Sequence, residues 1–298
     1  MRGVCLLVAL ALSACAKNDA TIEIWKDFSG DNALRHVQAL VDCGPRPSGT
    51  PEIECARKYI IAQLENFGWK VTKQAFTDQT PRGALNFVNL VATFPSKGNA
   101  KNPPSFLLCS HYDTKFFETA RFVGANDGGS SNGLLIEMAR VLAQAPLLAE
   151  KVELVFFDGE EAYVSFTSDD GLYGSRYFAR RLGFEDKAKQ FKGGILFDMC
   201  GDKSLGITLS TDSPPDLTRD IFAAAEKLNA RKYFTYAAGA ILDDHAPLNR
   251  IGIPTIDLID FDFADWHTTE DTMDKISAES LGIIGAVAAR YLAETALK

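Results

Sequence analysis

The sequence lacks any long apolar run. No stretch of about 18 consecutive apolar residues occurs in its 298 residues, so no transmembrane helix is expected. An excess of basic residues is also missing, because 31 Lys and Arg face 39 Asp and Glu, which gives a net charge of −8. Nucleic-acid binding needs clustered basic residues, so this balance argues against a nucleic-acid partner. Internal repeats and low-complexity tracts are absent too.

The rest of the composition is that of a folded protein. Hydrophobic residues make up 46% of the chain, aromatic residues 10% and charged residues 23%. Such values exclude a disordered or fibrous chain. The length alone allows either one large α/β domain or two small domains.

The first residues have the pattern of an export signal. A short basic start, Met1-Arg2-Gly3, precedes the apolar run 4–12 and then Leu12-Ser13-Ala14-Cys15. This resembles a bacterial lipoprotein signal, in which Cys15 becomes the lipidated first residue; the alternative is a plain secretory signal cleaved nearby. We expect a signal peptide over 1–14, a tether over 15–29 and the catalytic domain over 30–298. The location would be the periplasm or cell surface of a bacterium, with membrane contact through the lipid anchor only.

Cysteine is scarce, and its spacing excludes a thiolate metal site. The sequence has six Cys and no Cys-x-x-Cys pair. Export implies an oxidising compartment, and Cys43 and Cys55 flank a Gly- and Pro-rich loop, so a local disulfide between them is possible. Cys109 and Cys200 lie at the ends of apolar runs, which favours buried free thiols.

Apolar patterning predicts a chain that alternates strands and helices. Short apolar runs indicate strands buried on both faces, and Thr50-Pro51 has the form of a helix start. We expect a single-domain α/β fold, a three-layer sandwich whose mixed, mostly parallel sheet is flanked by helices. Strands are predicted at 71–76, 87–94, 106–109, 152–157, 195–197 and 254–259, and helices at 31–41, 51–66, 131–143, 172–182, 217–228 and 276–295.

Histidines and acidic residues gather where the predicted strands end. In α/β folds, sites form at the carboxyl ends of parallel strands, and the chain has only four His. A single His near a carboxylate is commonly a hydrogen-bonded structural residue, but here the pattern repeats. The combined set of imidazole and carboxylate groups suits Zn²⁺. Its members are His111, Asp127, Glu161, Asp198 and His267.

Two adjacent acids follow the apolar run 152–157. Glu160 and Glu161 point in different directions, so one can bind a metal while the other moves protons. Two solvated loop acids would be the structural alternative, but the apolar run before them favours deep placement. Asp127 lies in the glycine-rich segment 124–130, where it could cap a helix and bind a metal at once.

Several segments together resemble the zinc-dependent glutaminyl cyclases of the animal and bacterial type, whose fold is that of the zinc aminopeptidases. The resemblance covers about 44–292. The segments that carry it are Asp78-Gln79-Thr80-Pro81-Arg82-Gly83, His111-Tyr112-Asp113-Thr114-Lys115, Asp158-Gly159-Glu160-Glu161-Ala162, Asp243-Asp244-His245-Ala246-Pro247 and Trp266-His267-Thr268.

This resemblance implies a zinc-dependent conversion of the N-terminal glutamine of peptides or proteins to pyroglutamate, with release of ammonia. It implies one Zn²⁺ per chain and assigns a role to each matching residue. Glu160 would be the proton shuttle, with Asp198 and Asp243 beside it, and Trp266 and Phe166 would form the substrate wall. The implied zinc ligands are Asp127, Glu161 and His267.

The chain departs from the animal pattern at four positions that bear on the site. Phe166 replaces a tryptophan, Gly128 a serine and Asp257 a histidine; Asn132 replaces a cysteine, which leaves Cys109 without its usual disulfide partner. None of these changes removes a proposed metal ligand.

Two other functions remain open. A zinc aminopeptidase that releases N-terminal amino acids would bind two metals and use His111 and Asp198 for the second. A non-catalytic binding module on the same fold would be marked by a lost ligand, and none is lost.

Overall fold

The computed structural model describes residues 22–95 and 103–298. The predicted signal peptide over 1–14, Cys15 and the start of the predicted tether lie outside these residues. In the described part, no helix combines the length and apolarity needed to cross a membrane. The folded part begins before the predicted boundary at residue 30, because Ile24 and Trp25 of the short 3-10 helix η1 (Ile24–Lys26) are buried in the core.

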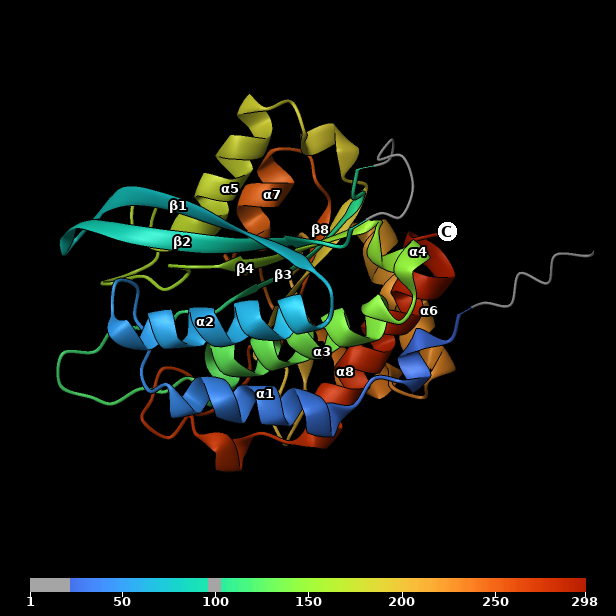
Figure 1. The fold of residues 1–298 in the computed structure, drawn as a ribbon. Helices are drawn as coiled ribbons and strands as arrows, with labels where there is room; N and C mark the ends of the chain where they lie inside the picture. The colour runs from blue at the N-terminus through green and yellow to red at the C-terminus, as the bar shows by residue number, and fades with distance from the viewer. Residues whose placement is uncertain (1–21, 96–102) are drawn as a thin grey trace, which may run out of the picture.

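An eight-stranded mixed sheet forms the middle layer, in the order β1-β2-β4-β3-β5-β8-β6-β7 (Figure 1). The central strands β4, β3, β5 and β8 are parallel, and the long β1–β2 hairpin forms one edge. At the other edge, β6 pairs antiparallel with β8 and parallel with β7. The bounds are β1 (Lys70–Thr80), β2 (Gly83–Thr93), β3 (Phe106–His111), β4 (Val152–Phe157), β5 (Gly193–Asp198), β6 (Ile207–Leu209), β7 (Phe234–Tyr236) and β8 (Thr255–Ile259).

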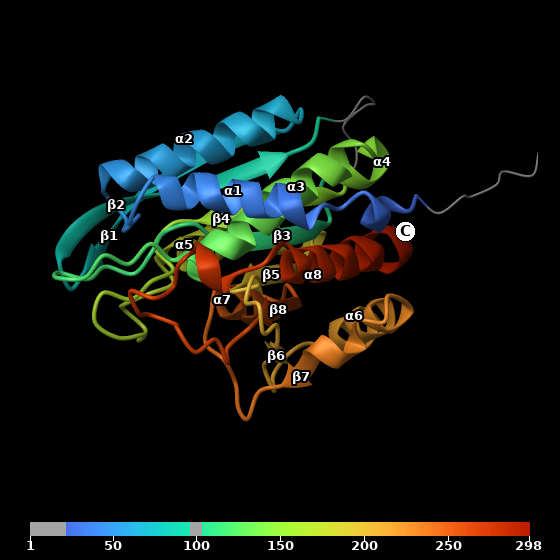
Figure 2. The same ribbon diagram turned by 90° about the horizontal axis from the view of Figure 1, so that it is seen from below.

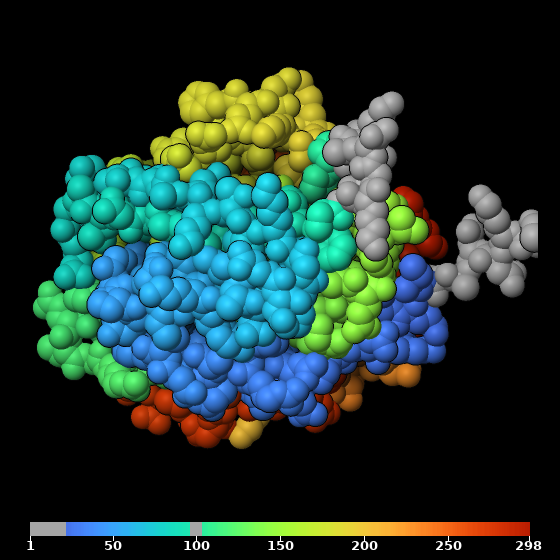
Figure 3. All heavy atoms as spheres, in the orientation of Figure 1, coloured from blue at the N-terminus to red at the C-terminus, as the bar shows by residue number. Residues whose placement is uncertain are grey.

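Helices cover both faces of the sheet (Figure 2). One face carries α1 (Gly30–Asp42), α2 (Pro51–Asn66), α3 (Ser131–Ala143), α6 (Pro215–Lys227) and α8 (Ala278–Tyr291), which share the larger apolar core with the strands. The opposite face carries α5 (Tyr173–Phe184) and α7 (His245–Arg250), which pack on a second core. Figure 3 shows α1, α2 and the β1–β2 hairpin as one continuous surface. Shorter elements are η2 (Ala125–Ser130), α4 (Pro146–Ala149), η3 (Ala188–Gln190), η4 (Arg231–Tyr233), η5 (Met273–Lys275) and η6 (Leu292–Ala296).

Local sequence signals explain several of these boundaries. The Thr50 side chain caps α2 by accepting a hydrogen bond from the Ile53 amide at 3.3 Å, and Pro51 fills the first helical position. Strands β3 and β5 are buried along their whole length, as expected for central strands that lie between helices.

The predicted single-domain, three-layer α/β sandwich is confirmed. So is the possible disulfide, because Cys43 and Cys55 are bonded with a Cα–Cα distance of 5.8 Å. Cys109 and Cys200 are buried free thiols, as predicted. The elements that the pattern did not predict are short: β6 and β7 have three residues each, and α7 has six.

Candidate metal centre and active site

The predicted site residues meet at the edge where the parallel strands end. His111 is the last residue of β3 and Asp198 the last of β5, while Glu160 and Glu161 directly follow β4. His267 comes from the loop after β8. Because β4, β3, β5 and β8 are neighbours in the sheet, side chains far apart in sequence are brought to one place.

Asp127, Glu161 and His267 form a candidate metal site. The Nε2 atom of His267 lies 3.3 Å from Asp127 Oδ2 and 3.1 Å from Glu161 Oε2. Both carboxylates are buried. Apart from these contacts with His267 and a contact of 3.7 Å between Lys115 Nζ and Glu161 Oε2, Asp127 Oδ2 and both Glu161 oxygens accept no hydrogen bond. Buried carboxylate oxygens without donors are unfavourable unless a cation is bound. One imidazole and two carboxylates are a ligand set that fits Zn²⁺.

The protonation of these residues reflects their mutual contacts. Burial by itself lowers the pKa of His267, but the Asp127 and Glu161 carboxylates outweigh burial and raise that pKa to about 9. Burial raises the pKa of Asp127, but the His111 and His267 imidazoles, each with a nitrogen 3.3 Å from an Asp127 oxygen, outweigh burial and hold that pKa below its ordinary value.

A second group of potential ligands shares Asp127 with the first. His111 Nε2 lies 3.3 Å from Asp127 Oδ1 and 3.4 Å from Asp198 Oδ1, and all three residues are buried. Both nitrogen atoms of His111 lack a hydrogen-bond partner. The structure therefore brings together the residues predicted for the second metal in the aminopeptidase alternative.

The backbone around Asp127 is held by a carboxylate that the sequence did not reveal. Asp271, from the loop after β8, accepts hydrogen bonds from the amides of Asn126 at 2.7 Å and Asp127 at 3.0 Å. Gly128 follows with φ of +71°, and a Cβ there would lie 2.8 Å from the Asp113 carbonyl oxygen. In this backbone, glycine is therefore required where the animal pattern has serine.

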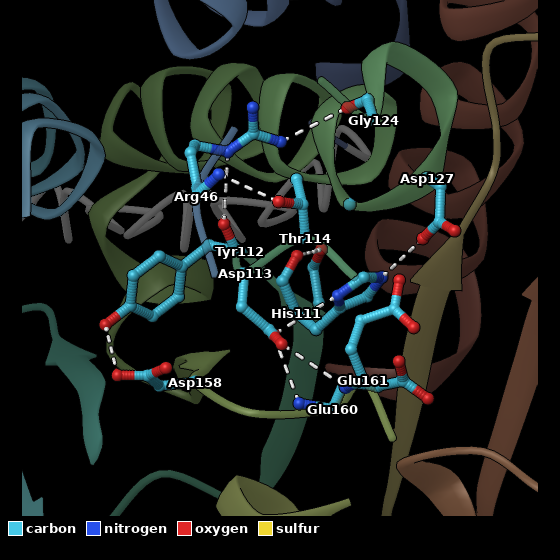
Figure 4. Close-up of polar contacts among 12 residues, drawn as sticks. Arg46, His111, Tyr112, Asp113, Thr114, Gly124, Asp127, Asp158, Glu160 and Glu161 are labelled. Atoms are coloured by element: carbon cyan, nitrogen blue, oxygen red, sulfur yellow. Dashed lines mark hydrogen bonds and ion pairs between the residues drawn. The ribbon is translucent and has the colours of Figure 1, made fainter. Parts of the chain in front are cut away.

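Asp113 plays a similar part for the two glutamates (Figure 4). Its carboxylate accepts hydrogen bonds from the amides of Glu160 at 3.1 Å and Glu161 at 3.2 Å, and lies 3.4 Å from His111 Nδ1. One buried side chain thus orients a candidate metal ligand, a candidate proton shuttle and a histidine. The sequence placed Asp113 at a strand end, but nothing in the pattern assigned it this role.

Glu160 is placed to exchange protons in the pocket. Its side chain is buried and lines the same cavity as Asp198, Asp243 and His267. Burial raises the pKa of Glu160 well above the ordinary value, His111 opposes that rise, and the charges of Glu161 and Asp243 add to it. A carboxyl group with a raised pKa can accept and return a proton near neutral pH.

An acidic network continues behind Glu160. Burial, with the charge of Asp198, raises the pKa of Asp243 to about 6. Burial raises that of Asp257 well above its ordinary value, and Asp257 Oδ2 lies 3.5 Å from His245 Nδ1. Asp257, at the position where the animal pattern has a histidine, thus lies beside His245 and close enough to Asp243 and Asp198 for their charges to add to the rise of its pKa. Asp243, His245 and Asp257 also lie close enough together to bind a cation.

Aromatic side chains form the mouth of the pocket. Trp266 stacks on His267 with ring centroids 4.1 Å apart and is 40% exposed, and Phe166 lines the same cavity. The two predicted wall residues are therefore both at the pocket. Its inner free space is about 30 Å³, room for one or two groups of the size of water.

Arg46 supports the backbone that leads to Asp127, although nothing in the sequence around Arg46 indicated this role. It is 1% exposed and donates hydrogen bonds to the backbone oxygens of Val123 at 2.7 Å and Gly124 at 3.2 Å (Figure 4). Those residues lead into Asp127. The buried guanidinium thus fixes the approach of the segment that carries the candidate metal ligand.

Asn132 occupies the position of the expected disulfide partner of Cys109, which is a free thiol in this structure. Its side-chain amide donates hydrogen bonds to the backbone oxygens of His111 and Gly128. It therefore ties the end of β3 to the segment of Asp127 by hydrogen bonds, at the position where the animal pattern has a cysteine.

Comparisons with known proteins agree with this arrangement. The family model described as peptidase family M28 matches residues 89–292. The glutaminyl-peptide cyclotransferase of Dictyostelium discoideum is 29% identical over 299 residues, which cover 84% of this chain and 81% of that protein.

Solved structures include both kinds of relative. The glutaminyl cyclase of Porphyromonas gingivalis superposes with a TM-score of 0.80 at 33% identity, covering 89% of this chain and 98% of that one. A leucine aminopeptidase precursor from Bacteroides thetaiotaomicron superposes with a TM-score of 0.79 at 28% identity, covering 90% and 97%.

Proposed function

The chain belongs to peptidase family M28 and, within it, to the glutaminyl cyclases, and from this membership and its site we propose that it is a glutaminyl-peptide cyclotransferase. Its substrates are peptides or proteins with N-terminal glutamine, and its products are N-terminal pyroglutamate and ammonia. The observation that supports this most is the buried triad Asp127, Glu161 and His267 with Glu160 directly beside it.

We propose one Zn²⁺ per chain, held by that triad, whose donor-free oxygens fit a cation. When bound, the metal supplies a Lewis acid that polarises the γ-carbonyl of the substrate glutamine. The protein groups around it are already oriented, since Asp113 and Asp271 fix the backbone on which Glu161 and Asp127 lie.

The proton transfers fall to Glu160 and its acidic neighbours. The Glu160 carboxylate accepts a proton from the substrate α-amine, whose ordinary pKa is about 7.7–8.0. The amine nitrogen then bonds to Cδ, the carbon of the γ-carboxamide, and closes a five-membered ring. Glu160 returns the proton to the departing amide nitrogen, and the bond between that nitrogen and Cδ breaks to release ammonia. Asp198 and Asp243 stabilise the proton on Glu160 between these steps.

The walls of the pocket hold the reacting groups in place. The nucleophile and the carbonyl belong to one residue, so positioning contributes much of the rate. Trp266 and Phe166 enclose the glutamine side chain and limit its contact with water.

The second candidate is a two-metal zinc aminopeptidase. It is favoured by one specific observation, the buried group His111, Asp127 and Asp198. In the proposed cyclase, His111 instead pairs with the carboxylates of Asp127 and Asp198, at 3.3 Å and 3.4 Å, and holds Asp127 in place.

Two measurements on the zinc-loaded protein separate the candidates. We expect ammonia release from glutamine-initiated peptides, no leucine release from leucine amide, and one tightly bound zinc per chain. Two zinc ions with release of leucine would instead establish the aminopeptidase.

Export and lipidation complete the proposal. We propose cleavage after residue 14 and lipid attachment at Cys15, with the enzyme at the periplasmic or outer surface of a bacterial membrane. Replacing Cys15 by Ser should move the protein from the membrane fraction to the soluble fraction. An unchanged distribution would contradict lipid anchoring.

A further inference from the structure

A cavity of about 570 Å³ lies between the β1–β2 hairpin and α5, on the face of the sheet that carries the second core (Figure 1). We call it the α5 cavity. It shares no lining residue with the active-site pocket. A concave space of this size, lined by apolar side chains and a few charged ones, has the form of a small-molecule site. Its apolar lining includes Val91, Tyr177, Phe178, Leu182 and Phe191.

One carboxyl group of the sheet faces this cavity, that of Glu153 in β4. Side chains alternate between the two faces of a strand, so Glu153 lies on the same face as Val155 and Phe157, which belong to the second core. Strand β4 lies between β2 and β3, where Glu153 has Thr93 and Leu107 as its neighbours across the two strand pairs. The acid is therefore half-buried on an interior strand and not at an edge of the sheet.

The charge of Glu153 has no partner in the described part of the chain. Within residues 22–95 and 103–298, its carboxylate has neither a hydrogen-bond donor nor an ion pair. The cations of the lining are engaged elsewhere, because Lys187 and Arg181 both pair with Glu185, Lys187 at 2.6 Å. Lys73 extends from the opposite face of the sheet, since its neighbour across the strand pair belongs to the larger core. In agreement, burial raises the pKa of Glu153 to about 7, although Lys187 opposes the rise.

The partner that fits this place is a positive charge on an apolar body. A half-buried carboxylate is stabilised when an ammonium group donates hydrogen bonds to it. Aromatic rings also attract an ammonium group, and Tyr177 and Phe178 line the same cavity. Leu182 and Phe191 offer surface to the rest of the ligand. A metal ion fits less well, because a single carboxylate supplies too few ligands.

We propose that the α5 cavity binds an organic amine, one ammonium group on an aromatic or aliphatic body, and that Glu153 anchors the ammonium group. The body of the ligand lies between α5 and the β1–β2 hairpin. This site is separate from the metal centre, since Glu153 is near the start of β4 whereas Glu160 and Glu161 follow its end. The inference goes beyond the proposed cyclisation and does not depend on it.

The test uses phenethylamine as the probe and phenethyl alcohol as its matched control. The two share the same body, and only the amine carries a charge. At about pH 8 the Glu153 carboxyl is ionised and an alkylamine is still protonated. With the zinc-loaded full chain, calorimetry should give a Kd of about 1 mM for the amine, an ordinary affinity for so small a ligand. The alcohol should bind about tenfold more weakly, because it forms no charged hydrogen bond.

Two variants locate the amine in the α5 cavity. Glu153→Gln removes the charge and keeps the shape, and Thr93→Phe fills the space across the strand pair from Glu153. Each should weaken amine binding about tenfold and leave cyclisation of a glutamine peptide unchanged. The exposed substitution Glu65→Gln in α2 is the matched control for a lost acid and should bind the amine normally. Glu161→Gln, in the metal site, should also bind it normally.

The outcomes divide clearly. Amine binding that is lost in Glu153→Gln and Thr93→Phe, and kept in Glu65→Gln and Glu161→Gln, supports the assignment. No binding up to about 10 mM, or equal binding of the amine and the alcohol, would overturn it. Binding that survives both cavity variants, or that is lost only in Glu161→Gln, would overturn it too, since the amine would then lie elsewhere. If Thr93→Phe fails to fold, the isosteric Glu153→Gln decides alone.

Discussion

Glu160 and Glu161 are neighbours in the chain but differ in what surrounds them. Both amides are held by Asp113, so the backbone is fixed and the side chains diverge. Glu161 lies against His267 and Lys115, whereas Glu160 faces the pocket and Asp243. Two identical side chains thus acquire a ligand role and a proton-transfer role from their surroundings.

Replacing Glu160 by Gln should abolish most turnover and keep the metal. General acid–base groups contribute about 10²- to 10⁴-fold, so kcat should fall by about that factor. Ammonia release and zinc content per chain provide the two measurements. The neighbouring variant Glu161→Gln serves as comparison, because it should lose bound zinc as well as turnover. Turnover of Glu160→Gln within twofold of the unmodified protein would rule out its proposed role.

Replacing Asp271 by Ala should weaken metal binding although Asp271 touches no metal. Its carboxylate holds the amides of Asn126 and Asp127, so its loss frees the backbone of a ligand. Supporting residues of this kind usually change metal affinity about 10- to 100-fold. Competition with a chelator measures the change, and exposed Asp274→Ala is the control. Equal zinc affinity in both variants would mean that Asp271 does not position the ligand.

The site residues show what sequence can and cannot reveal at this scale. Residue types suited to a metal gave a wider set, and the resemblance to the cyclases singled out Asp127, Glu161 and His267 within it. The structure brings these three side chains together. Asp113, Asp271 and Arg46 act through backbone groups far away in sequence. Such contacts leave no pattern in the chain, so only the structure identifies them.

Among the elements, α1 and α2 depend on a covalent link. The Cys43–Cys55 disulfide joins the end of α1 to the first turns of α2 across a separation of 12 residues. Closing a loop of this length restricts the unfolded chain.

The double variant Cys43→Ala/Cys55→Ala should lower the free energy of unfolding by about 2–3 kcal/mol. For a domain of this size, that corresponds to a melting temperature lower by about 5–10 °C. Reductant should bring the unmodified protein to the same value, because Cys109 and Cys200 form no disulfide. A melting temperature that is insensitive to reductant would show that this link contributes little.

Strand β4 contains a half-buried acid, Glu153, that makes the stability of the protein depend on pH. Burial raises the pKa of Glu153 to about 7, although Lys187 opposes the rise. In the unfolded chain the pKa would be near its ordinary value of 4.5. The folded protein therefore binds a proton that the unfolded chain releases, and stability falls as pH rises from about 4.5 to about 7.

Glu153→Gln should remove this loss, because the glutamine side chain stays neutral at every pH. Above pH 7.5 the variant should be more stable than the unmodified protein by up to about 3 kcal/mol, and near pH 4.5 the two should be alike. Urea unfolding at several pH values measures the difference. The exposed substitution Glu65→Gln is the control, and parallel pH profiles for all three proteins would contradict this account.

Helices and strands that contain a clear apolar pattern over six residues or more could be predicted from the sequence. The shortest strands could not. Segments 131–143 and 152–157 coincide with α3 and β4 to the residue. Strands β6 and β7 are three residues long, too short for alternation to be visible in the sequence.

At the scale of the whole molecule, part of the excess of Asp and Glu over Lys and Arg lies in the interior. Asp113, Asp127, Glu160, Glu161 and Asp198 are all buried at one end of the sheet. Their burial close together is explained by a bound cation and shared protons, since uncompensated buried carboxylates would oppose folding.

The described chain starts near one end of the parallel strands, and the pocket lies at the other end. The helix η1 lies beside the C-terminus at the end where the parallel strands begin (Figure 1). The pocket lies at the end where those strands finish.

The most direct test of the central claim is the mass spectrum of a glutamine-initiated peptide after incubation with the zinc-loaded protein. Cyclisation predicts a peptide of the same length that is lighter by the mass of ammonia, about 17 Da, since the reaction joins the α-amine to the carbon of the γ-carboxamide and expels ammonia. Loss of the whole first residue, or a peptide of unchanged mass, would contradict the assignment of this chain as a glutaminyl cyclase.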